Sequence, residues 1–344
     1  MNTSTKDIFK TKLHEISDIV LNRETNLGQL RDSLIELKTL FFSVSEVDCN
    51  STEYLIDIHG ETGKAVGPKW AELCLDDIVR TKQFINGAYE AVQSVTHRKK
   101  EAPVILLYVG TGPFGTLIMP LLTQFKPCQL QLILVEINPI SVTALKNTIR
   151  NFGMEEYIKE IKMVDAAQVQ LENASEIDIL LLECLQFALV KEQQVAITYN
   201  LIPQLRKDVL LLPEEINLSI CLIDSKKKMN YLMHSVDGSP PDYFKKINSI
   251  FELSKEEIRR KELNLGKLVF PEITTYLPKE DVNEYDSVAI TTEIKVFGNH
   301  TLDIDQCSLT MCFKIDSMEN VKSKKALKTQ YLVNEKPGTK IVWI

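Results

Sequence analysis

The sequence predicts an α/β fold in which a parallel sheet wrapped by helices lies between a helical region and a strand-rich region. Short apolar runs alternate with amphipathic helices in residues 101–223, which is the pattern of a parallel sheet. Apolar residues recur at helical spacing before this stretch and at strand spacing after it. We therefore expect three parts: residues 1–100, residues 101–223 and residues 224–344.

The first part is expected to be helical to about residue 60, because apolar residues recur there every three or four positions. These residues are Leu27, Leu30, Leu34, Leu37 and Phe41. We expect them to form one helix face that packs on its own domain, in preference to a dimer or peptide contact. A second helix is expected from Pro68 to about Val95, since proline suits the first helical turn.

Apolar runs of strand length follow in the middle part. They are residues 104–109, 130–135, 161–164, 177–182, 209–212 and 218–223. A helix is expected between the second and third runs, where Asn138 can cap the first turn and Pro139 fits it. Each run is far shorter than the roughly 20 apolar residues that span a bilayer, so we expect no membrane segment.

The last part alternates apolar and polar residues, which is strand periodicity. The alternation is clear in residues 288–296, is followed by a possible tight hairpin turn at Gly298 and Asn299, and returns in residues 309–313. A helix is expected near residues 245–262. We therefore predict an antiparallel sheet or barrel with one inserted helix.

Charge and cysteine content argue against several classes of function. The 344 residues carry a formal net charge of −7, whereas a general nucleic-acid binder needs a basic face to neutralise phosphates. The seven cysteines are scattered singly, which suggests reduced thiols and neither a disulfide framework nor a zinc site. The polar N-terminus has no apolar signal core. We expect a soluble, cytoplasmic protein without a bound metal.

A glycine-rich segment follows the first predicted strand and is expected to open a helix. It contains Gly110, Thr111, Gly112 and Gly115. Glycines at such a turn let the backbone approach a ligand and aim helix N-terminal amides at it. Glu136 ends the second predicted strand, where a carboxylate can accept hydrogen bonds from both hydroxyls of a ribose. The pattern predicts a Rossmann-like nucleoside-cofactor site, and taken alone it suits a nicotinamide dinucleotide equally well.

Asp165 and Ala166 follow the third predicted strand and make the cofactor prediction more specific. A carboxylate there can accept a hydrogen bond from an adenine amino group, and the backbone of Ala166 can bond to the ring. Asp165 taken alone could also be a helix cap or a turn residue. Together with Gly110, Gly112 and Glu136, cofactor binding is the stronger interpretation.

Glu183 and Glu192 stand nine residues apart after the fourth predicted strand. Their segment resembles the double-glutamate loop of protein arginine methyltransferases, and residues 76–81 are similar to that family's helix before the first strand. The resemblance covers roughly residues 65–344. It implies a class I methyltransferase domain with a C-terminal barrel-like domain, and S-adenosylmethionine as cofactor.

The same resemblance implies roles for individual residues. Arg80 would bind the carboxylate of the cofactor, a bidentate task that suits a guanidinium. Glu183 and Glu192 would be catalytic residues that orient a substrate guanidinium and balance its charge, and Glu183 would also face the cofactor. Two elements that close the arginine pocket in that family are missing, however: an aromatic motif ahead of Arg80 and a Thr-His-Trp in the C-terminal part.

A closer resemblance is to the peptide C-terminal carboxyl methyltransferases of lanthipeptide and lasso-peptide gene clusters. Two segments carry it: residues 63–68 with the positions up to Gly87, and residues 108–116. In that case the acceptor is a carboxylate, which is ionised at neutral pH and needs cationic or amide donors in place of a general base. Lys64 and His59 are candidates for this task, although an exposed loop position is the commoner role for such residues.

The leading hypothesis is an S-adenosylmethionine-dependent O-methyltransferase that esterifies the C-terminal carboxylate of a ribosomally made, modified peptide. The alternative is an arginine N-methyltransferase that acts on a protein or peptide. A nicotinamide-dependent oxidoreductase and a cofactor-binding protein without catalysis are two further hypotheses. The expected partner is a peptide substrate, with neither nucleic acid nor a membrane, and a homodimer is left open.

Overall fold

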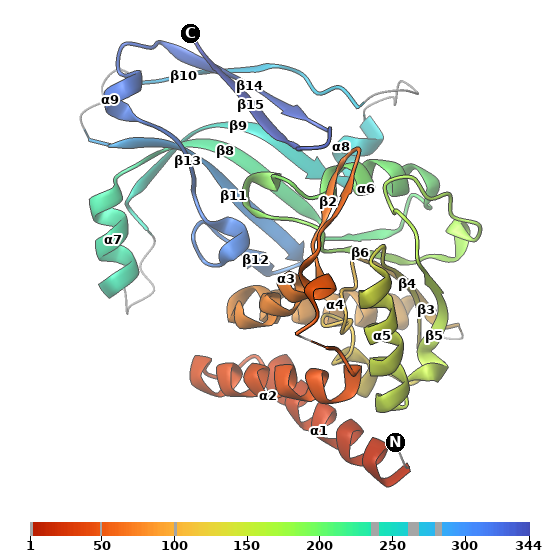
Figure 1. The fold of residues 1–344 in the computed structure, drawn as a ribbon. Helices are drawn as coiled ribbons and strands as arrows, with labels where there is room; N and C mark the ends of the chain where they lie inside the picture. The colour runs from red at the N-terminus through yellow and green to blue at the C-terminus, as the bar shows by residue number, and fades with distance from the viewer. Residues whose placement is uncertain (1–2, 49, 100–101, 235–240, 261–267, 279–283) are drawn as a thin grey trace.

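The computed structural model describes residues 3–48, 50–99, 102–234, 241–260, 268–278 and 284–344. The helices are α1 (Thr3–Leu21), α2 (Leu27–Ser45), α3 (Pro68–Leu73), α4 (Ile78–Lys99), α5 (Pro139–Phe152), α6 (Gln194–Leu201), α7 (Ser225–His234), α8 (Lys255–Arg260) and α9 (Met318–Val321). In Figure 1, α1 and α2 lie at the N-terminal end of the molecule, the parallel strands come next, and the antiparallel strands lie beyond them, near the C-terminus.

The parallel sheet has the order β5-β4-β3-β6-β7. Its strands are β3 (Val104–Val109), β4 (Leu130–Val135), β5 (Ile158–Lys162), β6 (Ile179–Leu182) and β7 (Leu210–Leu212). The predicted runs at 104–109 and 130–135 coincide with β3 and β4, whereas β5 begins and ends earlier than the predicted run at 161–164. Helix α5 is also confirmed, because the Asn138 side chain caps it by accepting from the backbone N–H of Ile140 at 2.9 Å.

The antiparallel strands form two sheets, with the orders β12-β11-β8-β9 and β10-β14-β15, and β13 also pairs with β11. The remaining strands are β1 (Ile58–Gly60), β2 (Gly63–Ala65), β8 (Glu215–Ile223), β9 (Phe244–Ser254), β10 (Ile273–Tyr276), β11 (Ser287–Phe297), β12 (His300–Leu302), β13 (Phe313–Ser317), β14 (Ala326–Leu332) and β15 (Gly338–Trp343). The parallel sheet and the C-terminal antiparallel sheets together confirm the predicted fold class.

The second sheet begins earlier than the sequence pattern indicates. The run at 218–223 was expected to alternate with helices like the preceding strands, but it lies in β8, which pairs antiparallel with β9 and β11. The chain therefore changes sheet between β7 and β8, ahead of residue 224. The division of the chain into the three predicted parts stays a prediction.

The helix predicted near residues 245–262 is largely wrong. Residues 244–254 form β9, residues 255–260 form the short α8, and residues 261–262 lie outside the described residues. The pairing of β9 with β8 shifts register at two places, between Leu218 and Ser219 and between Ile220 and Cys221. Such irregularities interrupt the two-residue alternation by which a strand is recognised. The hairpin turn at Gly298 is confirmed, since Phe297 pairs with His300.

Strand periodicity also fails at residues 309–313. Leu309 belongs to the 3₁₀ turn Ser308–Thr310, and Met311 lies between that turn and β13. The regular strand starts only at Phe313.

The helix predicted from Pro68 to Val95 is broken in two. Pro68 does begin a helix, as predicted, but α3 ends at Leu73 and a 3₁₀ turn leads to Asp77. Asp77 has φ −88° and ψ 89°, which an α-helix cannot contain, and its carboxylate accepts from the backbone N–H of Arg80 at 3.2 Å. Asp77 therefore ends one helical segment and starts α4.

The N-terminal helices pack on the rest of the chain. Leu30, Leu34, Leu37 and Phe41 are buried between α2 and its neighbours α1 and α5, which confirms that this face serves its own fold. Leu27 is the exception, because it begins the helix and is 68% exposed. The helical prediction to residue 60 is wrong beyond Ser45: Glu46 adopts a left-handed conformation, and residues 58–65 form the β1–β2 hairpin.

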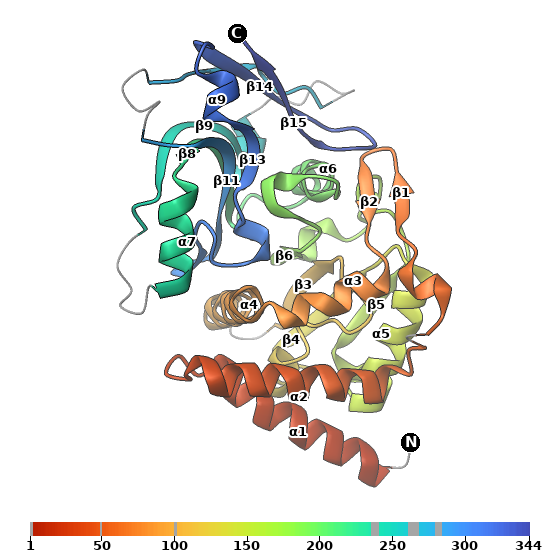
Figure 2. The ribbon, with the colours of Figure 1, turned by 60° about the vertical axis from the view of Figure 1, so that its left-hand side comes forward.

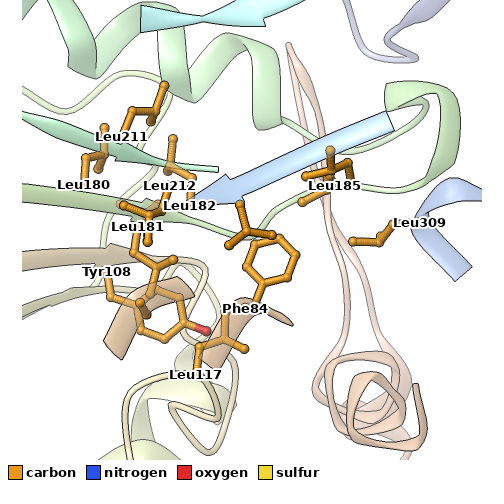
Figure 3. Close-up of a cluster of buried hydrophobic side chains, with 14 of the residues drawn as sticks. Phe84, Tyr108, Leu117, Leu180, Leu181, Leu182, Leu185, Leu211, Leu212 and Leu309 are labelled. Carbon is orange, nitrogen blue, oxygen red and sulfur yellow. The ribbon is translucent and has the colours of Figure 1, made fainter. Parts of the chain in front are cut away.

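The core runs from the parallel sheet to both outer layers. Figure 3 shows Phe84 of α4 beside Tyr108 of β3 and Leu182 of β6, with leucines of β6 and β7 next to them. In the N-terminal layer, Phe41 of α2 stacks on Phe114 with ring centroids 5.2 Å apart. Phe114 belongs to the glycine-rich segment after β3, so α2 supports that segment from behind.

Replacing Phe41 with alanine is expected to lower the free energy of unfolding by about 3–5 kcal/mol, because the ring is fully buried and its loss leaves a cavity. Ile35→Ala is the matched control, since Ile35 lies on the same helix but is 52% exposed, and it should cost less than about 1 kcal/mol. Urea denaturation measures both values. Equal losses would contradict the packing of α2 described above.

Candidate functional site

A cavity of about 330 Å³ opens at the carboxyl ends of β3, β4 and β6. From the central strand β3 the chain continues to β4 on one side of the sheet and returns to β6 on the other. This is a topological switch point, where ligands bind in open α/β sheets. The cavity brings together every residue predicted for the site: Arg80, Gly110, Thr111, Gly112, Glu136, Asp165, Ala166, Glu183 and Glu192.

The glycine-rich segment forms the floor of this cavity without opening an α-helix. Gly110 and Gly112 have φ values of +76° and +59°, which only glycine adopts without strain. A side chain at Gly110 would also collide with the Sγ atom of Cys184. Residues 112–120 form a series of turns, because positive φ at Gly112 and Gly115 excludes a continuous helix. The predicted helix is therefore wrong, while the predicted close approach of backbone to the cavity is confirmed.

Glu136 links two turns at the cavity wall. Its carboxylate accepts from the backbone N–H of Gly112 at 2.8 Å and of Asn138 at 2.9 Å. The side chain is buried, and burial raises its pKa although both N–H donors act in the opposite direction. These two bonds fix the direction of the carboxylate at the end of β4.

Arg80 and Glu183 form a buried ion pair across the cavity. The guanidinium of Arg80, in the first turn of α4, donates to Oε1 of Glu183, the residue after β6. Burial alone would lower the pKa of Arg80, but the charge of Glu183 outweighs it and holds the pKa above its usual range. Burial also raises the pKa of Glu183, against the charge of Arg80. Removing either partner would leave the other as an uncompensated buried charge.

Glu192 lies in the same cavity and has a different electrostatic environment. Burial, followed by the charge of Glu183, raises the pKa of Glu192 to about 7. Arg80, Lys64 and a hydrogen bond with Gln186 act in the opposite direction but do not restore the usual value. The Glu192 carboxyl group therefore holds a proton to higher pH than an ordinary glutamate, whereas Glu183 is paired with a cation.

Asp165 has the turn role that its sequence position allows, and it also lines the cavity. Its Oδ1 atom accepts from the backbone N–H of Ala167 at 2.9 Å, and its carbonyl accepts from Val169 at 3.0 Å. The following residue, Ala166, lines the cavity as well. The local turn thus places Ala166 at the cavity.

Residues that the sequence pattern does not indicate reach the cavity from distant segments. The backbone N–H of Ser308 donates to Asp77 at 2.7 Å across 231 positions, and Ser308, Leu309 and Met311 line the cavity. No local signal predicts this contact. Tyr108 also lines the cavity, and its place just before Gly110 at the end of β3 could have indicated it.

The two candidates for an acceptor-binding cation differ in position. Lys64 lines the cavity, whereas His59 is exposed and is not among the residues described as lining it. Lys64 therefore stays a candidate for binding an acceptor carboxylate, and His59 does not.

Metal ligands, membrane-spanning helices and disulfides can be assessed for the described residues. Within these ranges, no group of three or more His, Cys, Asp or Glu side chains is placed to hold a metal ion, and no helix is long and apolar enough to cross a membrane. Each described cysteine is a free thiol, and Cys49 lies outside the described residues.

Glu192→Gln is expected to stabilise the protein at alkaline pH. The unfolded carboxyl group titrates near 4.5 and the folded one near 7, so the folded protein loses stability as pH rises through this window. The variant lacks this loss, and its advantage should grow by up to about 3 kcal/mol between pH 5 and pH 8.5. Urea denaturation at both pH values measures it. Glu172→Gln, at an exposed position, should show no such pH dependence, and the same result for Glu192→Gln would contradict the raised pKa.

Comparison with known proteins bears on the fold. Neither a protein-family model nor a curated protein matches the chain. The crystal structure of PRMT6 with SAH is similar to it, with a TM-score of 0.54 at 11% identity, covering 80% of this chain and 99% of that one. The crystal structure of PRMT6 gives a TM-score of 0.53 at 10% identity, covering 80% of this chain and 98% of that one. This chain thus has the fold of PRMT6, a protein arginine methyltransferase: a Rossmann-like parallel sheet followed by an antiparallel domain.

Proposed function

We propose that this protein is an S-adenosylmethionine-dependent methyltransferase. The observation that carries the proposal is the convergence of the glycine-rich segment, Glu136 and the Arg80–Glu183 pair on one cavity at the switch point of the sheet. Its volume of about 330 Å³ is within the usual range for small-molecule sites. The fold that it shares with PRMT6, whose structure was solved with SAH, agrees with this choice of cofactor.

The chain's own residues suit the parts of this cofactor. Glu136, fixed by two backbone N–H groups, would accept from the ribose hydroxyls. Asp165 and Ala166 would bind the adenine edge, and the backbone at 110–112 would face the amino-acid portion. Arg80 would bind the cofactor's carboxylate. The bound cofactor would supply a methyl group on a sulfonium, so that transfer to a carboxylate oxygen yields a methyl ester and S-adenosylhomocysteine.

For the acceptor we propose the C-terminal carboxylate of a ribosomally made, modified peptide. Two glutamates beside a substrate carboxylate would repel it unless their charge is reduced. Here Glu183 is paired with Arg80, and burial raises the pKa of Glu192 to about 7, which lowers its negative charge at neutral pH. A carboxylate acceptor requires no proton to be removed, so the site needs to hold and orient it in line with the methyl donor.

Methylation of arginine is the second candidate, and one observation favours it. Four acidic side chains line the cavity, namely Glu136, Asp165, Glu183 and Glu192, against the two cations Arg80 and Lys64 in the described lining. A guanidinium would be attracted by Glu183 and Glu192, and Glu192 with a pKa near 7 could accept the proton that N-methylation releases.

Binding of S-adenosylmethionine is tested by thermal denaturation. The cofactor should raise the Tm of the wild-type protein by several degrees, whereas NAD should leave it unchanged. Arg80→Met should weaken cofactor binding about ten-fold or more, because a charged hydrogen-bond partner of the cofactor is lost. Arg98→Met, an exposed position on the same helix, is the control and should bind normally. Stabilisation by NAD alone would contradict the proposal.

The two acceptors predict opposite responses to pH. Rates with an arginine-free peptide that has a free C-terminus should fall as pH rises through about 7, because the ionised Glu192 repels the acceptor carboxylate. Rates with an amidated, arginine-containing peptide would instead rise through the same pH, since ionised Glu192 binds guanidinium and accepts its proton.

Mass spectrometry of the products identifies the acceptor directly. A methyl ester is lost in mild base and is not formed on an amidated peptide, whereas methylarginine survives base treatment. Methylation that persists after amidation would refute esterification. Cofactor binding without turnover of any peptide would favour a binding protein without catalysis.

A further inference from the structure

We infer that Lys64, on the β1–β2 hairpin, binds the anionic group of the methyl acceptor and thereby selects a carboxylate substrate. The inference rests on the proposed methyl transfer to a carboxylate and deepens it by naming a specificity-determining residue. It is drawn from where the hairpin lies and from the charges that surround its lysine.

The hairpin is attached to the loop that carries Glu192. The backbone N–H of Lys64 donates to the carbonyl of Lys191 at 2.8 Å, and Lys64 and Glu192 form an isolated parallel bridge. The amide of Gln193 donates to the hydroxyl of Thr62 at 2.9 Å. Figure 2 shows the hairpin extending from the helical layer to the turn between β14 and β15. The hairpin therefore lies directly beside the loop that carries Glu192.

The contact between hairpin and loop leaves no room for a side chain at Gly63. This glycine has φ +131°, and a Cβ atom there would lie 2.8 Å from the carbonyl oxygen of Lys191 and 3.1 Å from Pro337. The turn at Pro337 is itself joined to the loop, since its carbonyl accepts from the N–H of Lys191 at 3.0 Å. These contacts fix the backbone of Lys64 next to the backbone of Glu192.

Asp57 holds the Lys64 side chain through an ion pair. Its carboxylate accepts from the Lys64 ammonium at 2.5 Å and from the backbone N–H of Gly67 at 2.8 Å. Burial would raise the pKa of Asp57, but these bonds and the lysine charge outweigh it and keep the carboxylate ionised. Since an ammonium has three donors and the described residues give it one acceptor, it retains donors for a ligand.

The other cation of the described cavity lining is already occupied. Arg80 is paired with Glu183 and is the residue that suits the cofactor's carboxylate. Lys64 is 21% exposed, lines the cavity and acts electrostatically on Glu192. In the described lining, Lys64 is therefore the cation that can bind an acceptor carboxylate near Glu192 without giving up a bond to Glu183 or to the cofactor.

Lys64→Met tests the inference, with Lys64→Arg as the charge-conserving variant and Lys146→Met, at an exposed position, as control. For an arginine-free peptide with a free C-terminus, we expect Lys64→Met to raise KM about ten-fold or more with a smaller change in kcat. Lys64→Arg should recover most of the affinity. The Tm increase produced by S-adenosylmethionine should be the same in all variants, because Lys64 does not bind the cofactor.

Lys64→Met combined with Asp57→Asn guards against misfolding, since it removes both charges together. The double variant should fold, bind the cofactor and show the raised KM. An unchanged KM in Lys64→Met, or loss of the cofactor-induced Tm increase in the folded double variant, would overturn the inference. Failure of the cofactor to stabilise the wild type would instead refute the proposed methyltransferase. Methylation of amidated arginine peptides alone would refute the carboxylate acceptor, and with it this role of Lys64.

Discussion

The buried ion pair between Arg80 and Glu183 is the interaction on which the cavity depends. It joins the start of α4 to the end of β6. Removing either residue would leave the other as a buried charge without compensation. The remaining acidic groups are each balanced differently: Glu136 by backbone N–H groups, Asp165 by its own turn, and Glu192 by partial protonation. The charge of Arg80 and the raised pKa of Glu192 together lower the net negative charge of a cavity rich in carboxyl groups.

Elements defined by local chemistry were predictable from the sequence. Strand β3 is a continuous apolar run, β4 is one interrupted only by Gln131, and α5 has an asparagine cap, a proline in its first turn and an apolar stripe. Elements whose form depends on distant partners were not. Strand β9 takes its shape from a pairing with β8 that changes register, and the β1–β2 hairpin lies against the loop at Lys191. In both, a local pattern was a poor guide because contacts far along the chain decide the conformation.

The candidate site shows the same division. Glycine turns and acidic residues at strand ends are local signals, and all the residues chosen from them reach one cavity. The sequence could not reveal that Glu183 would form an ion pair, because its partner Arg80 is 103 positions away. Nor could it reveal that Asp57 orients Lys64, since both are ordinary loop residues until the hairpin forms.

Asp77 connects helix α4 to the antiparallel domain. One carboxylate oxygen accepts from the N–H of Arg80 and the other from the N–H of Ser308, so a single side chain fastens the start of α4 to a loop of the antiparallel domain. The antiparallel domain is therefore not an interchangeable attachment. Exchanging it for that of a relative would remove the anchor of the arginine's own helix, so chimeras made at the sheet boundary would need this junction preserved.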